Sequence, residues 1–152
     1  KRKVIAIILM VAIIALTLVF LRAQPSGIET FSSVMTENGY TVSDMTEELR
    51  TDWRVGSLIE DSRSLHTEDM QIDFCVMDST DSARRIYSGM TLPVKDGKEY
   101  TYKGANYTLF SMEDDNLYTA KIYSGNTVIY AAASHECRDE LVDLLRQMGY
   151  YK

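Results

Sequence analysis

An uninterrupted apolar run near the start of the chain constrains this protein most strongly. Residues 4–21 include no charged residue, no glycine and no proline. A helix of this length rises about 27 Å, close to the thickness of the hydrocarbon core of a bilayer. Only a helix satisfies all of its own backbone amides within lipid. The sequence therefore predicts a transmembrane helix over residues 4–21, in contact with membrane lipid.

The charges that flank this run predict its orientation. Three basic residues, at positions 1–3, precede it, and only Arg22 follows closely. The positive-inside rule makes residues 1–3 a cytoplasmic stub, residues 22–27 a linker and residues 28–152 an extracytoplasmic domain. A cleaved signal peptide is the alternative, but Leu21 occupies a position where cleavage requires a small side chain. We expect a single-pass protein of the cell membrane.

The acidic charge of the domain limits its partners. The first 22 residues hold four of the 16 basic side chains and none of the 22 acidic ones, so residues 23–152 carry a net charge of −10. Phosphate backbones and anionic head groups repel such a domain. We therefore expect no binding to nucleic acid.

The domain sequence predicts an α+β fold, with one curved antiparallel sheet and about three helices packed on one of its faces. Apolar and polar residues alternate from Met70 to Val76, as in a strand with one buried face. Residues 57–65 also have the pattern of a strand. Short turns with hairpin residues then separate four strands, which implies antiparallel pairing. These four are expected over Lys98–Lys103, Asn106–Met112, Leu117–Tyr123 and Thr127–Ala133.

Apolar side chains that recur every three or four residues predict the three helices. The first covers residues 27–38 and ends at Gly39, the second presents Ala83 and Ile86, and the last ends at Gly149. The expected N-caps are Ser26, Ser79 or Thr80, and Ser134.

The two cysteines of the chain leave open whether a disulfide forms. Cys137 lies on the apolar stripe of the last helix, so it is expected to point into the core. Cys75 lies on the strand face opposite Phe74, and Met77 on the same face suggests that both faces of the sheet are partly covered. A Cys75–Cys137 disulfide and two buried free thiols are both consistent with this pattern.

Motifs for catalysis or for metal binding are missing from the sequence. His66 falls in a polar stretch and is expected to be exposed, while His135 begins a helix, where adjacent side chains rarely share a metal. Neither a Gly-x-Ser-x-Gly elbow nor a glycine-rich phosphate loop occurs. Carboxylate pairs such as those within 113–115 are typical of solvated turns. We predict no catalytic, metal or cofactor residues and no cofactor, with an enzyme left open.

Tyrosines concentrate in the predicted meander, at positions 100, 102, 107, 118, 123 and 130. Most of these rings are expected to pack as cross-strand pairs. Tyr100 and Tyr102 lie on a strand that is expected at an edge of the sheet. They are the first candidates for an exposed binding surface.

Several runs carry a resemblance to a known group: residues 39–46, residues 72–74 with Ser82-Ala83, residues 126–131 and the ending Met148-Gly149-Tyr150. The chain resembles uncharacterised, membrane-anchored small proteins of Gram-positive bacteria, which join an N-terminal transmembrane helix to an extracytoplasmic α+β domain. The resemblance implies this architecture and no activity.

These features predict a membrane-anchored extracytoplasmic interaction or sensing domain, with an envelope protein as a possible partner. The anchor helix has no polar face, so it is not expected to line a channel. An envelope hydrolase that uses carboxylates and a structural subunit of a membrane complex are the alternatives.

Overall fold

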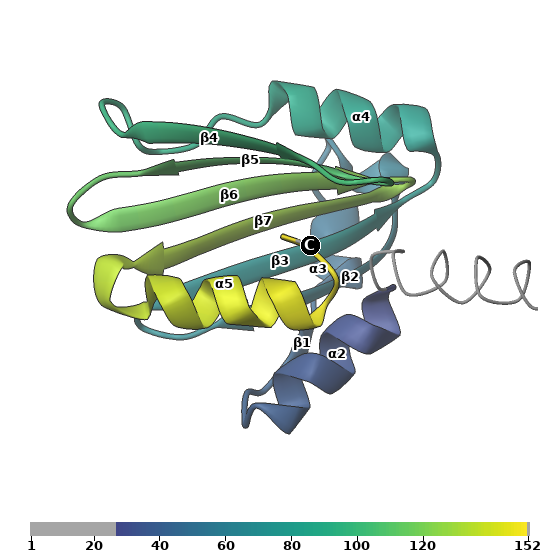
Figure 1. Ribbon diagram of the computed structural model, residues 1–152. Coiled ribbons are helices and arrows are strands. Elements are labelled where there is room, and N and C mark those ends of the chain that lie inside the picture. The colour runs from purple at the N-terminus through teal and green to yellow at the C-terminus, as the bar shows by residue number, and fades with distance from the viewer. Residues whose placement is uncertain (1–26, 152) are drawn as a thin grey trace, which may run out of the picture.

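The computed structural model describes residues 27–151. The predicted cytoplasmic stub, the transmembrane helix and most of the linker lie outside the described residues. Among the residues described, no helix is both long and apolar enough to span a membrane. The described part is an α+β unit built on one seven-stranded antiparallel sheet (Figure 1).

The strands of the sheet follow the order β1-β2-β3-β7-β6-β5-β4. The meander predicted from the hairpin turns forms one side of the sheet and leaves β4 at an edge. Its last strand, β7, returns to pair with β3, so that Phe74 lies opposite Ile129. The bounds are β1 (Ser43–Asp44), β2 (Ile59–His66), β3 (Met70–Met77), β4 (Lys98–Lys103), β5 (Thr108–Glu113), β6 (Leu117–Ser124) and β7 (Thr127–Ser134).

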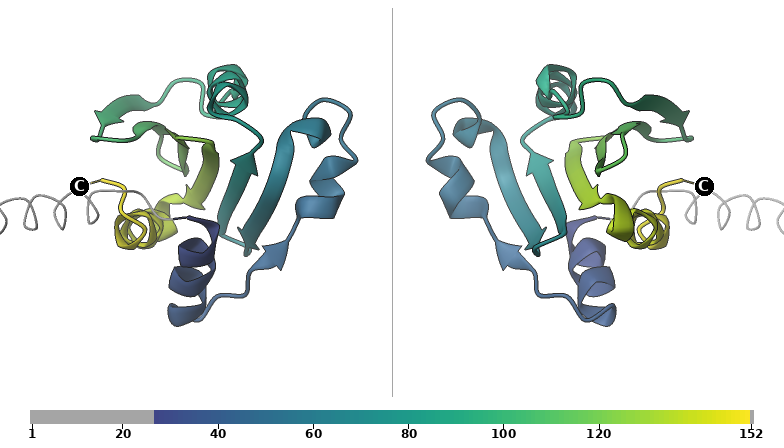
Figure 2. Two further views of the ribbon diagram at one scale, coloured as in Figure 1. Left: turned by 90° about the vertical axis from the view of Figure 1, so that its right-hand side faces the viewer. Right: turned by 90° about the vertical axis from the view of Figure 1, so that its left-hand side faces the viewer.

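Two helices, α2 (Ile28–Glu37) and α5 (Arg138–Gln147), cover one face of the sheet (Figure 2). Phe31 of α2 stacks on Phe74 of β3, with ring centroids 5.3 Å apart. Leu141 and Leu145 of α5 are fully buried in the same cluster. The alternating apolar residues of β3, β6 and β7 form the other half of this core. Burial of apolar area on this face is the main stabilising contribution.

The other face of the sheet is covered at one end by α3 (Thr46–Arg50) and α4 (Thr80–Gly89). There Ala83 is buried with Met77 and Val128, and Leu49 packs against them. The expectation that the helices share one face is therefore wrong for α4. An apolar stripe shows that a helix packs against the sheet. The same stripe would occur whichever face of the sheet the helix covered. Cys75 and Met77 were the sequence signal that the second face is also covered.

Lys121 of β6 connects α4 to the sheet. Its Nζ donates to the carbonyl oxygens of Tyr87 at 3.1 Å and Met90 at 2.7 Å. The last carbonyls of a helix have no partner within the helix and carry partial negative charge, so a cation stabilises them. Lys121 therefore fixes the C-terminal end of α4 over the sheet.

The helix ends partly follow the predictions. Gly39 and Gly149 have φ angles of 85° and 101° and end α2 and α5, as expected for left-handed C-caps. Ser79 is confirmed as an N-cap, since its side chain accepts from the amide of Ser82. The predicted cap at Ser134 is wrong, because a 3-10 turn (His135–Cys137) precedes α5 and the buried Ser134 hydroxyl bonds to no group within residues 27–151. The N-cap of α2 is Gly27, and Ser26 lies outside the described residues.

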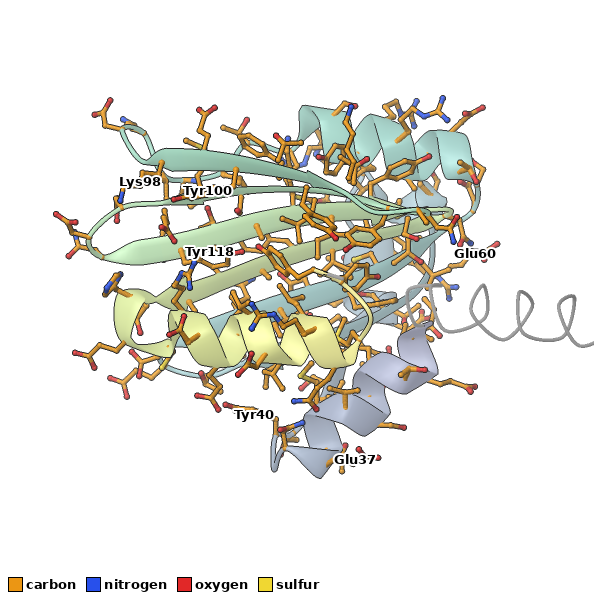
Figure 3. All side chains as sticks on the ribbon, viewed as in Figure 1. Glu37, Tyr40, Glu60, Lys98, Tyr100 and Tyr118 are labelled. Carbon is orange, nitrogen blue, oxygen red and sulfur yellow. The ribbon has the colours of Figure 1, made fainter. Side chains whose placement is uncertain are left out.

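A hydrogen bond between Tyr40 and Glu140 joins the end of α2 to α5 (Figure 3). The carboxylate of Glu140, which accepts this bond, together with partial burial raises the pKa of Tyr40 to about 12. A tyrosine whose pKa is higher in the folded state stabilises the fold below the unfolded pKa, about 10. It loses this contribution as the pH rises towards 12.

We therefore expect Tyr40→Phe to be less stable than wild type at pH 8 and to approach it between pH 10 and 12. Urea unfolding of both proteins across this range measures the difference. A difference that stays constant up to pH 12 would show that Tyr40 does not act through this bond.

Candidate functional site

A groove lies on the face of the sheet that α3 and α4 only partly cover. It encloses a cavity of about 290 Å³. Leu49 of α3 and Ile86 of α4 line its helix side, and Val128 of β7 lines its sheet side. Most of the lining is apolar, and the full set is Met45, Leu49, Ser64, His66, Asp73, Cys75, Ile86, Met90, Val128 and Tyr130. Ligand sites in proteins are typically such apolar hollows with a few polar groups.

The polar end of the groove is organised around Asp73. One of its carboxylate oxygens accepts from the Ser64 hydroxyl at 2.6 Å and contacts Nε2 of His66 at 2.9 Å. The other accepts from the Gln71 side-chain amide at 2.5 Å. The register of β2 and β3 creates this cluster, because it places Ser64 opposite Asp73 and His66 opposite Gln71. All four side chains thus come from paired strands, which hold them in fixed positions.

The cluster contains serine, histidine and aspartate but is not arranged for nucleophilic catalysis. The Ser64 hydroxyl and His66 Nε2 both meet the same oxygen of Asp73. An activated serine needs a base that takes its proton, with the carboxylate on the far side of that base. When Nε2–H of a neutral His66 is donated to Asp73, Nδ1 is left as an acceptor for a ligand. The arrangement suits recognition of a hydrogen-bonding group.

Cys75 contributes its thiol to the floor of the groove. Burial raises the pKa of this thiol, although the Ser62 hydroxyl, 3.4 Å from Sγ, acts in the opposite direction. A protonated thiol is a weak nucleophile, so Cys75 serves here as a small apolar side chain. Burial, together with the charge of Asp73, also raises the pKa of Tyr130 in the same floor.

The second cysteine lies far from this groove. Cys137 packs against the core beneath α2 and α5, on the opposite side of the sheet from Cys75, and both thiols are free. A disulfide needs Cβ atoms about 3.8 Å apart, which the intervening sheet prevents in this conformation.

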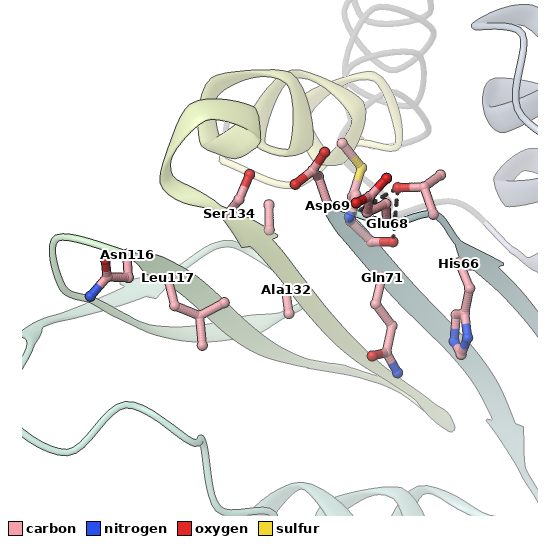
Figure 4. Close-up of a pocket in the computed structure, with 11 residues that line it drawn as sticks. His66, Glu68, Asp69, Gln71, Asn116, Leu117, Ala132 and Ser134 are labelled. Atoms are coloured by element: carbon pink, nitrogen blue, oxygen red, sulfur yellow. Dashed lines mark hydrogen bonds between the residues drawn. The ribbon is translucent and has the colours of Figure 1, made fainter.

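A second hollow of about 420 Å³ adjoins the groove along the uncovered half of the same face (Figure 4). His66 lines both hollows. Gln71 and Ala132 form part of the floor, and the acidic Glu68 and Asp69 lie at the rim. The two hollows share the open face of β2, β3 and β7, with an apolar end and a polar, acidic end.

Tyr100 and Tyr102 lie away from this groove, on the edge strand β4 (Figure 3). Tyr100 is 49% exposed. Tyr102 is half-buried, and its ring stacks on Tyr107 with centroids 5.7 Å apart. Both tyrosines line a hollow of about 360 Å³ beside α5, which also contains Arg138. Because Arg138 already pairs with Glu113 at 3.0 Å and Asp139 at 2.6 Å, its charge is largely compensated.

The polar cluster of the groove was missed from the sequence. His66 was expected to be exposed, and it is, but its carboxylate partner Asp73 was not foreseen. The available signal was the tight turn at 67–69, which makes β2 and β3 a hairpin and brings polar residues of both strands onto one face. Within residues 27–151, no group of histidine, cysteine and acidic side chains could hold a metal ion.

Comparisons with known proteins give only distant similarity. No protein-family model matches the chain, and no curated protein matches it. Among solved structures, a GTP-binding regulator from Thermotoga maritima is 12% identical with a TM-score of 0.46, over 80% of this chain and 84% of that one. The extracellular domain of PknH from Mycobacterium tuberculosis is 11% identical with a TM-score of 0.36, over 84% and 96% of the two chains. Both TM-scores lie below 0.5, so the function proposed next rests on this chain's own residues.

Proposed function

We propose that the chain is an extracytoplasmic binding domain, held at the membrane by residues 4–21, which takes a ligand in the groove between α3 and α4. The apolar run and the basic residues at positions 1–3 support the anchor and its orientation. The resemblance of residues 39–46, residues 126–131 and the ending Met148-Gly149-Tyr150 to membrane-anchored small proteins of Gram-positive bacteria implies the same architecture. An envelope protein that presents the ligand is the corresponding partner.

The observation that carries the proposal is the groove itself, which has apolar walls and one polar end. Leu49 and Ile86 suit an apolar group, and the Asp73–His66 pair suits a hydrogen-bonding head. The cavity of about 290 Å³ is near the lower limit for ligand sites, so the bound group is small. Net negative charge on the domain and acidic side chains at the rim oppose anions. The ligand class is therefore a small amphipathic molecule or side chain that is neutral or cationic.

The alternative of a hydrolase that uses carboxylates has less support from this site. Among the described residues, Asp73 is the one carboxylate that lines the groove, and both of its oxygens already accept hydrogen bonds. Glycoside hydrolysis typically needs two carboxyl groups facing each other across about 5–9.5 Å. The groove thus favours binding over hydrolysis.

Hexanol, hexylamine and hexanoate test the groove as probes of one chain length and three head groups. We expect hexanol and hexylamine to shift the amide NMR signals of Cys75, Ile86 and Val128 in the fragment 24–152, and hexanoate to bind at least about five-fold more weakly because of the local negative charge.

The matched variants are Leu49→Glu, which places a charge in the wall, and Thr51→Glu, which places the same charge on an exposed site two residues further along the chain. Leu49→Glu should weaken hexanol binding about ten-fold or more, and Thr51→Glu should leave it unchanged. Shifts that map to another face of the domain, or equal affinity in both variants, would rule out the groove as the site.

A further inference from the structure

The outer edge of β4 is open in the part of the chain that the structure describes. Strand β4 pairs with β5 on one side and is the last strand of the sheet on the other (Figure 1). Five of its six residues are exposed and the sixth, Tyr102, is half-buried. The opposite edge strand, β1, has only two residues. Because an open edge presents backbone donors and acceptors in a row, β4 is the place where this sheet can be extended.

The sequence of β4 is complementary to itself when read in the antiparallel direction. With Thr101 as the centre, Glu99 of one copy lies opposite Lys103 of a second copy. Tyr100 then lies opposite the second Tyr102, and Thr101 opposite Thr101. A two-fold axis repeats each contact, so this register creates two glutamate–lysine pairs and two tyrosine pairs. Such cross-strand pairs stabilise antiparallel sheets.

The two faces of β4 fit this register. The pairing with β5 places Tyr100 opposite Ser111 and Tyr102 opposite Leu109, on the face that α5 covers. Glu99 and Lys103 are exposed and alternate with these tyrosines, so their charged groups lie on the other face. Among the described residues, neither has an ion-pair partner. In the joined sheet, rings would meet rings on one face and opposite charges would meet on the other.

The neighbouring registers are less favourable. A centre between Tyr100 and Thr101 would place Lys98 opposite Lys103, but these side chains lie on opposite faces of β4, so a two-fold axis perpendicular to the sheet cannot form this register. A centre at Tyr100 places Glu99 opposite Thr101 and leaves both charges without a partner. Only the centre at Thr101 pairs every glutamate with a lysine.

We propose that two copies of the chain associate through β4, antiparallel, about a two-fold axis at Thr101. A two-fold axis perpendicular to the sheet keeps α2 and α5 on the same side in both copies, so Ile28, where α2 begins, lies on that side in both. Two copies anchored in one membrane fit this arrangement. A single strand pair is a small interface between two acidic domains, so the dimer is weak in dilute solution and favoured by confinement in a membrane. The groove involves β2, β3 and β7, so this proposal does not depend on it.

Cysteine crosslinking of the full chain in lipid vesicles tests the register. The parent carries Cys75→Ala and Cys137→Ala, and single cysteines are added as Thr101→Cys, Tyr100→Cys and Glu99→Cys. Directly opposite residues have Cα atoms about 4.5–5.5 Å apart, within the range for a disulfide, whereas the two Glu99 positions would be about 13 Å apart. Thr101→Cys should crosslink fastest, and its lead over Glu99→Cys should persist when the vesicles contain fewer chains per lipid.

A charge exchange tests the pairs themselves in the Thr101→Cys protein. Glu99→Lys and Lys103→Glu should each slow crosslinking about five-fold or more, because each single change creates two pairs of like charge. The double variant restores both pairs and should return to within about two-fold of the parent rate. All three sites are exposed, and unchanged thermal unfolding confirms that each variant is folded. Fastest crosslinking at Tyr100 or Glu99, or a double variant as slow as the singles, would overturn the proposal.

Discussion

Replacing Phe74 with alanine should lower the free energy of unfolding of the fragment 24–152 by about 3–5 kcal/mol. Phe74 lies in the middle of β3 with none of its surface exposed, and its ring stacks on Phe31 of α2. Its removal leaves a cavity between the sheet and α2 that the paired strands on either side cannot close. Urea unfolding followed by circular dichroism measures the loss.

The matched control for Phe74 is Trp53, an aromatic side chain that is 91% exposed. Trp53→Ala should change the free energy of unfolding by no more than about 0.5 kcal/mol. If the two alanine variants were equally stable, the packing of α2 on β3 described here would be incorrect.

The second large effect is expected from the addition of one methyl group, in Gly56→Ala. A Cβ at Gly56 would lie 2.1 Å from the backbone oxygen of Arg50, the last residue of α3. Backbone cannot move aside as a flexible side chain can, so α3 and the following turn must separate. We expect a loss of about 1–3 kcal/mol in urea unfolding. Since Leu49 of α3 is a wall of the groove, the same variant should also bind hexanol less well.

Gly89→Ala is the matched control, because a Cβ at Gly89 would meet nothing within 4 Å. Gly89 is the last residue of α4, and alanine favours a helix over glycine by up to about 1 kcal/mol. Gly89→Ala should therefore leave stability unchanged or raise it. If Gly89→Ala lost as much stability as Gly56→Ala, the close approach of Arg50 would not explain the loss at Gly56. The backbone freedom of glycine would then be the cause.

The sheet was largely predictable because its signals are local. Alternation from Met70 to Val76 and the hairpin turns after Lys103 and Ser124 identify strands and pair them in sequence. The pairing of β3 with β7 was not predictable in this way, because it joins segments about 55 residues apart. The sequence of neither strand specifies which distant strand it pairs with.

The candidate site was predicted less well than the fold. Tyr100 and Tyr102 lie on a strand expected at a sheet edge, and β4 is an edge strand. The groove was missed because it needs α3 and α4 on the second face of the sheet, and helix stripes do not specify a face. Whether His66 or Asp73 matters for function could be asked only once the β2–β3 register had brought them together.

The pairing of β3 with β7 also determines when the protein can fold during its synthesis. Strands β2 and β3 leave the ribosome well before β7 and α5, which complete the core around Phe74 and Leu141. Until then the apolar face of β3 has only α2 to cover it. Contacts between distant segments form slowly, and exposed strands of this kind aggregate readily. We therefore expect the nascent chain to expose the apolar face of β3 until its last strand has emerged.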